Sequence, residues 1–332
     1  MFKKSFIVVT FAFVLILGIL YQYLHKSEKD PRPTLVAITQ IAPHPSLDHI
    51  RKGIMDVLKE GGIHTDQITF QNAQGSPATA LQIAQKFVSL RPKVIIPITT
   101  PSAQAALSAA KAAGIPVIFS AVNDPALAKL VDESMTSDFA AGVSDFPPIA
   151  EQIQLIEDLF GANISVGVLY NAGEVNSVSV VSKFTTLAKE HGMQIFTAPA
   201  SNTNDVGTAA KSLIARGVKV IYIPNDNTVI SALESVLHAA ATTKTPVITS
   251  DPESVERGAL ASMAHSQYQI GRETGRLVLD LLDNKKSLKE IGVHRAKETL
   301  LSLNMSVAKK SHIVIPETLQ KKAKYIILPQ QN

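Results

Sequence analysis

The sequence KVIIP at residues 93–97 returns as KVIYIP at residues 219–224. Each copy is a run of apolar residues that ends at a proline, and such a run predicts a strand buried on both faces of a parallel sheet. The next apolar run is also paired, with IPVI at residues 115–118 and TPVI at residues 245–248. The two halves of the chain are therefore predicted to follow one plan.

The plan extends outward from these strands. First strands are predicted at 34–39 and 165–170, and each is followed by a helical segment that stops near a glycine, Gly61 or Gly192. The two copies lie roughly 130 residues apart, whereas the units of a solenoid are only ~20–50 residues long. Alternating strands and helices indicate right-handed βαβ units. We therefore predict an α/β protein with two doubly wound parallel-sheet lobes; a coincidence between two α/β halves is the alternative.

A hydrophobic segment precedes the repeat. Residues 5–24 carry no formal charge and follow Lys3 and Lys4, and a bilayer is spanned by about 20 apolar residues. No small-residue cleavage site follows the segment, and the two lysines favour a cytoplasmic N-terminus. We predict a signal or anchor helix with a tether over residues 1–33 and an extracytoplasmic protein, in the periplasm or on the outer face of the cytoplasmic membrane. A buried globular helix is the alternative.

Composition excludes several classes of function. The net charge is +4, but five basic and two acidic residues precede Thr34, so the rest of the chain is nearly neutral and nucleic acid is not an expected partner. The chain has no cysteine, which excludes disulfides, thiolate metal sites and a lipid-attachment cysteine. No catalytic, nucleotide-binding or metal-binding motif is recognisable. We therefore predict no catalytic residue, no metal and no cofactor.

A ligand is expected at the carboxyl ends of the predicted strands, because loops leading into helix N-termini gather there in open parallel sheets. These loops are rich in polar side chains in both halves of the chain. They supply the candidate ligand-binding residues His44, Thr99, Thr100, Ser102, Ala121, Asn123, Tyr170, Asn171, Glu174, Asn176, Ser177, Asn225, Asp226, Asn227 and Asp251.

The chemistry of these loops suggests both ends of a small zwitterion. The loop from Thr99 to Gln104 joins hydroxyls to a proline near a helix start, which suits a helix cap and also a bound carboxylate. Residues 225–227 read NDN and set one carboxylate between two amides, which suits an ammonium group. For Asp226 and Asp251 a cap or an Asx turn is the alternative. His44 is equally compatible with a ligand contact and with a solvated loop.

With these residues in view, the chain resembles the substrate-binding components of ABC importers with the type I periplasmic-binding fold, in the group that includes tryptophan- and tyrosine-binding proteins. The resemblance extends over residues 34 to about 323. It is carried by the segments at residues 44–48, 72–75, 98–104, 119–125, 142–145, 169–177, 222–227 and 250–255.

The resemblance implies two lobes joined by a multi-strand hinge. Crossings between the lobes are expected near residues 142–146, 265–267 and 296–304, so that residues 268–284 return to the first lobe. Lobe one would then comprise residues 34–143 plus 267–295, and lobe two residues 144–266 plus 300–325.

The resemblance also implies the ligand and the partners. An amino acid, with an aromatic one favoured, would be clamped between the lobes and delivered to a permease and an ATPase. Its carboxylate would meet Thr100 and Ser102, or instead Asn176 and Ser177. Its ammonium would meet Asp226 or Asp251, and Tyr170 and Phe119 are candidates for lining an aromatic side chain.

Two other functions remain open from the sequence. A membrane-anchored ligand sensor would use the same lobe closure, and it would need a partner for signalling. An enzyme would use Glu174, Asp226 and Asp251 as acids or bases. Because no catalytic set is recognisable, the chain is predicted not to be an enzyme.

Overall fold

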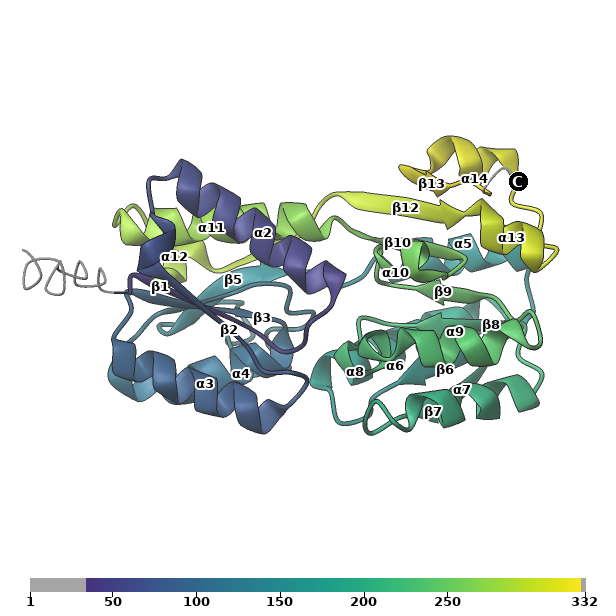
Figure 1. The fold of residues 1–332 in the computed structure, drawn as a ribbon, viewed down its shortest axis with the longest axis horizontal. Helices are drawn as coiled ribbons and strands as arrows, with labels where there is room; N and C mark the ends of the chain where they lie inside the picture. The colour runs from purple at the N-terminus through teal and green to yellow at the C-terminus, as the bar shows by residue number, and fades with distance from the viewer. Residues whose placement is uncertain (1–33, 330–332) are drawn as a thin grey trace, which may run out of the picture. The chain divides into compact units, whose positions relative to one another are not determined.

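The computed structural model of the protein describes residues 34–329 (Figure 1). These residues form two sheets, one six-stranded in the order β11-β5-β4-β3-β1-β2 and one seven-stranded in the order β13-β12-β10-β9-β8-β6-β7. We call the first sheet with its helices lobe one and the second sheet with its helices lobe two. The prediction of an α/β protein with two parallel-sheet lobes is confirmed.

Lobe one contains the following elements: β1 (Val36–Gln40), α2 (Pro45–Glu60), η1 (Thr65–Gln67), β2 (Ile68–Asn72), α3 (Pro77–Leu90), β3 (Val94–Ile98), α4 (Thr100–Ala110), η2 (Lys111–Ala113), β4 (Val117–Phe119), β5 (Ala140–Ser144), α11 (Gln267–Leu282), α12 (Leu288–Ile291) and β11 (Val293–Arg295).

Lobe two contains the following elements: α5 (Ile149–Phe160), β6 (Ser165–Tyr170), α6 (Val175–Glu190), β7 (Gln194–Pro199), α7 (Val206–Ala215), β8 (Val220–Ile223), α8 (Asn227–Ser231), α9 (Leu233–Ala241), β9 (Val247–Thr249), α10 (Ser254–Arg257), β10 (Ala261–His265), β12 (Thr299–Asn304), α13 (Met305–Lys310), α14 (Glu317–Lys322) and β13 (Tyr325–Ile327).

The repeated sequence pattern corresponds to a repeated strand order. The two KVI-type runs form β3 and β8, and the order β2-β1-β3-β4-β5 in lobe one has the same sense as β7-β6-β8-β9-β10 in lobe two. All of these strands pair in parallel. In each lobe the strand order reverses beside the first strand, at β1/β3 and at β6/β8, which is the place where such sheets bind ligands.

Strand β12 departs from the predicted parallel arrangement. It pairs with β10 in antiparallel register, with Ala261 opposite Leu303. The reason lies in the short connection before it, because only residues 296–298 separate β11 of lobe one from β12 of lobe two. Strand β11 runs parallel to β5 and therefore ends where β5 ends. Strand β12 consequently begins beside the carboxyl end of β10 and runs in the opposite direction to it.

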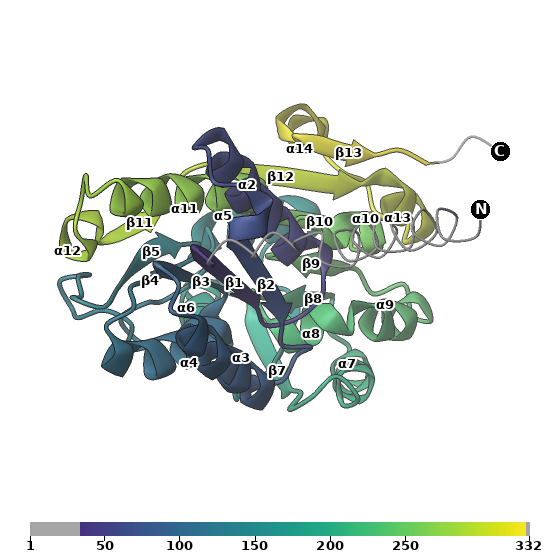
Figure 2. The ribbon, with the colours of Figure 1, turned by 60° about the vertical axis from the view of Figure 1, so that its left-hand side comes forward.

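Helices cover both faces of the sheet in lobe one. Figure 1 shows α2 and α11 side by side on one face and α3 and α4 on the other, and Figure 2 shows the same layers from another side. Helices α2 and α11 approach closely because of glycines at their contact. A Cβ atom at Gly271 would collide with the carbonyl oxygen of Ile50, and one at Gly53 would collide with that of Tyr268.

The sheet of lobe two is also covered on both faces. One core contains residues of α5, α6 and α13, and the other contains residues of α7, α8 and α9. The first core includes the stacked rings of Phe184 and Tyr222, whose centroids are 4.0 Å apart. Both rings are fully buried, so they stabilise the lobe by packing.

Within residues 34–329 the chain passes between the two sheets three times. It leaves lobe one between β5 and α5, returns between β10 and α11, and leaves again between β11 and β12. The first of these passages carries Asp145, immediately after β5.

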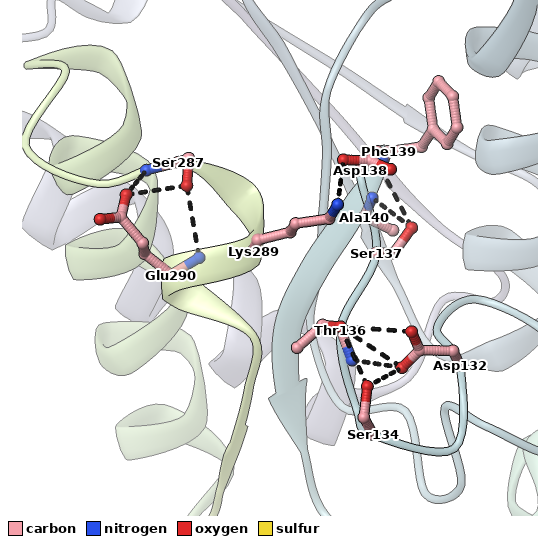
Figure 3. A network of polar contacts seen from close by, with 10 residues as sticks. All are labelled: Asp132, Ser134, Thr136, Ser137, Asp138, Phe139, Ala140, Ser287, Lys289 and Glu290. Carbon is pink, nitrogen blue, oxygen red and sulfur yellow. Dashed lines mark hydrogen bonds and ion pairs between the residues drawn. The ribbon is translucent and has the colours of Figure 1, made fainter.

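Polar contacts order the part of lobe one that precedes β5 (Figure 3). Asp132 accepts hydrogen bonds from the hydroxyl of Ser134 and from the backbone N–H of Thr136, at 2.7 and 3.0 Å. Nearby, Lys289 of α12 forms an ion pair with Asp138 at 2.9 Å. The side chains of Lys289 and Asp138 are both exposed, so this ion pair contributes little to stability.

The predicted membrane helix at residues 5–24 lies outside the described residues. Within residues 34–329, no helix is long and apolar enough to cross a membrane.

Candidate functional site

A pocket lies where loops from the carboxyl ends of both sheets meet. It has a volume of about 40 Å³, which is room for only a few waters at about 10–15 Å³ each. The side chains that line the pocket therefore leave little free space in it. Its walls are formed by His44, Ser46, Leu47, Thr99, Thr100, Ala121, Asn123, Asp145, Asn176, Asn225, Asp226, Asn227, Ile230, Ser250, Asp251 and Gln267.

Lobe one contributes the N-terminus of α4 to the pocket. The hydroxyl oxygens of Thr99 and Thr100 are buried and have no hydrogen-bond partner. Amides in the first turn of a helix lack intrahelical acceptors, and the helix dipole adds a partial positive charge at this end. Free hydroxyls and free amides thus converge on one side of the pocket, an arrangement that can bind an anionic oxygen.

Two residues in this wall have a strained backbone. Thr99 has a φ of 76° and Ala121 a φ of 54°, both in the left-handed region that favours glycine. Strain of this kind costs about 1–3 kcal/mol for each residue and persists where the surroundings impose it, commonly at binding sites. These two residues follow β3 and β4, at the points where the loops reach the pocket.

His44 lies in the pocket as a neutral ring. It precedes α2, is only 8% exposed, and neither ring nitrogen has a hydrogen-bond partner. Burial lowers the pKa of His44, and this effect outweighs the opposing charge of Asp251. A neutral imidazole offers one donor and one acceptor, so the side chain can bind either kind of ligand group.

Asp226 of lobe two is held by the protein itself. Its carboxylate accepts hydrogen bonds from the backbone N–H groups of Asn171 and Val229, at 2.5 and 2.8 Å, and from the hydroxyl of Ser177 at 2.7 Å. The bond to Val229 caps α8. Burial, and then the charge of Glu174, raise the pKa of Asp226 to about 7.

Glu174 stands behind this wall and fixes the start of α8. Its carboxylate accepts hydrogen bonds from the backbone N–H groups of Asn227 and Thr228, at 3.2 and 3.0 Å. It also accepts bonds from the side chains of Asn176, Asn227 and Thr228. Glu174 therefore positions the loop that carries Asn225 and Asp226.

Asp251 links the two lobes. Its carboxylate accepts hydrogen bonds from the hydroxyl of Ser46 in lobe one and from the hydroxyl and backbone N–H of Ser254. The hydroxyl of Ser46 also lies 2.8 Å from the carboxylate of Glu253, so its one proton is shared between the two acidic side chains. The start of α2 is thereby joined to the loop after β9.

Asp145 contacts residues of both lobes. It is 5% exposed, and its carboxylate accepts hydrogen bonds from the side-chain amides of Asn123 in lobe one, at 3.0 Å, and Asn225 in lobe two, at 3.2 Å. Burial raises the pKa of Asp145 to about 6, and the charge of His265 opposes this rise. The pocket lining contains no lysine or arginine.

Most of the candidate residues from the sequence lie together in this pocket. Those in its walls are His44, Thr99, Thr100, Ala121, Asn123, Asn176, Asn225, Asp226, Asn227 and Asp251. Ser102 is fully buried with an unpartnered hydroxyl but is not in the walls. Ser177 lies behind Asp226, and Asn171 and Glu174 border a neighbouring cavity.

The aromatic candidates are not in the pocket walls. Tyr170 is half-buried at the end of β6, and Phe119 is fully buried in the core of lobe one. The apolar part of the lining consists instead of Leu47, Ala121 and Ile230.

Sequence reasoning missed several lining residues, namely Ser46, Leu47, Asp145, Ile230, Ser250 and Gln267. Asp145 and Ser46 belong to segments that carry the family resemblance, so that signal was available. Gln267 begins α11 directly after a passage between the lobes, and only the folded chain shows that it reaches the pocket.

The comparisons with known proteins agree on one family. The family described as "ABC transporter substrate binding protein" matches residues 35–327. A tyrosine-binding protein of Clostridioides difficile is 35% identical over 278 residues, which is 82% of this chain and 79% of that protein.

Two solved structures resemble this one to different degrees. The ABC domain from Streptococcus pneumoniae in complex with L-Trp has a TM-score of 0.84 at 31% identity, covering 89% of this chain and 99% of that chain. The ligand-free, open structure of a substrate binding protein with adhesive properties from Clostridium difficile has a TM-score of 0.67 at 31% identity, covering 90% of this chain and 100% of that chain. The fold of residues 34–329 is thus more similar to the complex than to the open structure.

Proposed function

The chain belongs to the family of ABC transporter substrate-binding proteins, and from this membership we propose that it captures an amino acid, with an aromatic one favoured, for an ABC importer. Substrate-binding proteins of this family are extracytoplasmic. The proposed partners are a permease and an ATPase, to which the protein would deliver its ligand.

One observation carries this proposal. The pocket is shared by both lobes, and it contains buried polar atoms without partners, among them the hydroxyls of Thr99 and Thr100 and the ring nitrogens of His44. An unpartnered buried polar atom costs free energy, which a bound ligand recovers by hydrogen bonding. Such a site favours a closed, ligand-bound form, as lobe closure requires.

The chemistry of the walls supports an amino acid. The free hydroxyls and amides at the start of α4 suit a carboxylate, and the acidic side chains of the opposite walls suit an ammonium. Asn176 and Ser177 are less suitable for the carboxylate, because Asn176 donates to Asn225 and Glu174 and Ser177 donates to Asp226. The preference for an aromatic side chain rests on the tyrosine-binding relative and on the complex with L-Trp.

The proposal includes a division of the chain. Lobe one would comprise residues 34–143 plus 267–295, lobe two residues 144–266 plus 300–325, and residues 5–24 would anchor the protein to the membrane. The passages between the two sheets support the division, whereas the anchor rests on the sequence alone.

Thermal unfolding of the full-length protein with each of the twenty amino acids tests the ligand class. A ligand at 100 times its dissociation constant stabilises the native state by about 2.7 kcal/mol. We expect an upward shift of the unfolding temperature with tyrosine or tryptophan. Thr208→Val, an exposed substitution on α7, is the control and should show the same shift. No shift with any amino acid would rule out the proposed ligand class.

An uptake assay separates import from sensing. Cells that lack this protein should take up the radiolabelled ligand more slowly than cells that produce it. If uptake is the same in both, the importer role is wrong, and the anchored sensor becomes the better explanation of binding.

A further inference from the structure

We infer that Asp145 is the residue that makes the pocket select ligands with a protonated amino group, and that it does so only when both lobes are in place around it. This inference rests on the proposed function and assigns a role within that site. It follows from a comparison of the acidic side chains around the pocket.

Three of the four carboxylates are already engaged by the protein. A carboxylate can accept about four hydrogen bonds. Asp226 accepts from two backbone amides and a serine hydroxyl, and Asp251 accepts from two serines, one of which also gives its backbone amide. Glu174 accepts from the backbone and side chains of the residues around α8. These groups hold helix starts and loops in position.

Asp145 is different in its partners. Its carboxylate oxygens receive one side-chain amide each, from Asn123 and from Asn225, and the backbone N–H of Asp145 itself also acts on the carboxylate. No backbone amide of another described residue is bonded to it. The same Asn225 side chain carries an amide oxygen, buried and without a partner. The two ends of an amide share one carbon, so this oxygen lies beside the carboxylate. Asp145 and Asn225 together offer spare acceptors at one point of the pocket, which is what an ammonium with its three donors requires.

Within residues 34–329, no cation is hydrogen-bonded to the carboxylate of Asp145. The lining has no lysine or arginine. The charge of His265 acts on Asp145, but the His265 ring nitrogens donate to the backbone oxygens of Glu298 and Phe146 and not to the carboxylate. A buried carboxylate that no cation contacts is costly, and a cationic ligand group bonded to it relieves that cost. Burial also raises the pKa of Asp145, which reflects the cost of keeping this carboxylate ionised.

The position of Asp145 ties amine recognition to lobe closure. It lies on the passage from β5 to α5, and its partners come from the loop after β4 in lobe one and the loop after β8 in lobe two. When the lobes separate, the amide of Asn225 leaves the site. An amine is then held by Asp145 with fewer acceptors, so it stabilises the closed form over the open one.

The test compares each amino acid with its deaminated analogue by isothermal titration of the full-length protein. The probes are L-tryptophan with 3-indolepropanoate and L-tyrosine with 3-(4-hydroxyphenyl)propanoate, which keep the ring and the carboxylate. The unmodified protein should bind the amino acid about 10- to 100-fold more tightly than the analogue, because a charge-assisted hydrogen-bonding group is lost. In Asp145→Asn this preference should fall to within about threefold, mainly through weaker binding of the amino acid.

Asp251→Asn is the matched control. It also removes a negative charge from the pocket, but from a carboxylate that is already hydrogen-bonded to Ser46 and Ser254 of the protein. It should weaken both ligands of a pair alike and leave the preference intact. Asn225→Ala is a second test variant, and it leaves the charge of the pocket unchanged. It should partly lower the preference for the amino acid over its deaminated analogue. Thermal unfolding without ligand shows whether each variant is folded.

The outcomes are distinct. If the unmodified protein binds tryptophan or tyrosine and Asp145→Asn keeps the full preference for the amine, this inference is wrong and the proposed function stands. If Asp145→Asn is unfolded, an unchanged preference in Asn225→Ala overturns the inference. If the unmodified protein binds neither amino acid, the proposed ligand class and this inference fail together.

Discussion

Thr100 begins helix α4 with a buried hydroxyl that has no hydrogen-bond partner among the residues that the structure describes. Replacing it by valine, which has nearly the same shape, removes a proposed ligand contact without removing any bond within the protein. We expect Thr100→Val to weaken amino-acid binding by about tenfold, because a hydrogen bond to a charged group is lost. The unfolding temperature without ligand should not fall. Titration and thermal unfolding check the two parts, and a loss of ligand-free stability would contradict the assignment.

Asp145 predicts a pH dependence of the same site. Burial raises its pKa to about 6, and an amine is bound by the ionised carboxylate. Protonation therefore competes with the ligand, so affinity should fall as the pH decreases through about 6, by up to tenfold for each pH unit. Titrations at pH 5, 6 and 7 test this. Asp145→Asn is the control, and it should lose the part of the dependence that comes from Asp145 while any part from Asp226, whose pKa is raised to about 7, remains. An affinity that rises on acidification would contradict the prediction.

The sequence could predict that the candidate residues lie at the ends of strands, but it could predict no more about them than that. The loops that contain Thr99, Thr100 and Asn225 follow buried strands, and all parallel strands end at the same edge. The sequence could not show how each side chain is engaged. Asp226 appeared suited to a ligand ammonium, but it accepts backbone amides of its own lobe. The partners of Asp145 are distant in the sequence, with Asn123 lying 22 residues before it and Asn225 lying 80 residues after it.

At the scale of elements, the contact between α2 and α11 depends on glycine. A Cβ atom at Gly271 would meet the backbone of Ile50. We expect Gly271→Ala to destabilise the protein by about 1–3 kcal/mol, because overpacking forces the two backbones apart. Gly207 of α7 is the matched control, since a Cβ there meets nothing closer than Ser235 at 3.5 Å. Gly207→Ala should leave stability unchanged or raise it by up to about 1 kcal/mol, because alanine favours a helix. Denaturant unfolding measures both, and equal effects would contradict the packing argument.

The repeat in the sequence predicted the parallel strands β1, β3 and β4 of lobe one and their counterparts β6, β8 and β9 of lobe two. It could not predict β12, because this strand has no counterpart in the first half and takes its direction from the short link after β11. The return of α11 to lobe one came from the family resemblance and not from periodicity. An amphipathic helix shows that it has a buried face, but not which sheet or helix it will cover.

At the scale of the whole molecule, His49 and Glu253 join the two lobes near the pocket. The His49 ring nitrogen lies 2.7 Å from the Glu253 carboxylate. Hydrogen bonding to Glu253 raises the pKa of His49, and Glu256 and Asp48 add to this effect against the cost of burial. The ion pair therefore supports the closed form below the ordinary histidine pKa of about 6.5, and it is lost as the pH rises through the raised value.

This contact is partly exposed, so its contribution is below about 1 kcal/mol, or about fivefold in affinity. We expect His49→Gln to weaken ligand binding at pH 6 by no more than this factor and to have a smaller effect at pH 8. Comparing the variant with the unmodified protein at each pH removes the titration of other groups. A difference that is the same at both pH values, or larger at pH 8, would contradict this role.

The three passages between the sheets also set the order in which the protein can be completed during synthesis. The ribosome releases residues 36–144 first, but α11 and β11, which finish lobe one, are made only after β10 of lobe two. Until then the face of α2 that packs against α11 has no cover. A nascent chain therefore carries an unfinished first lobe while most of the second is being translated. Neither lobe can be removed or exchanged as a single continuous piece of the gene.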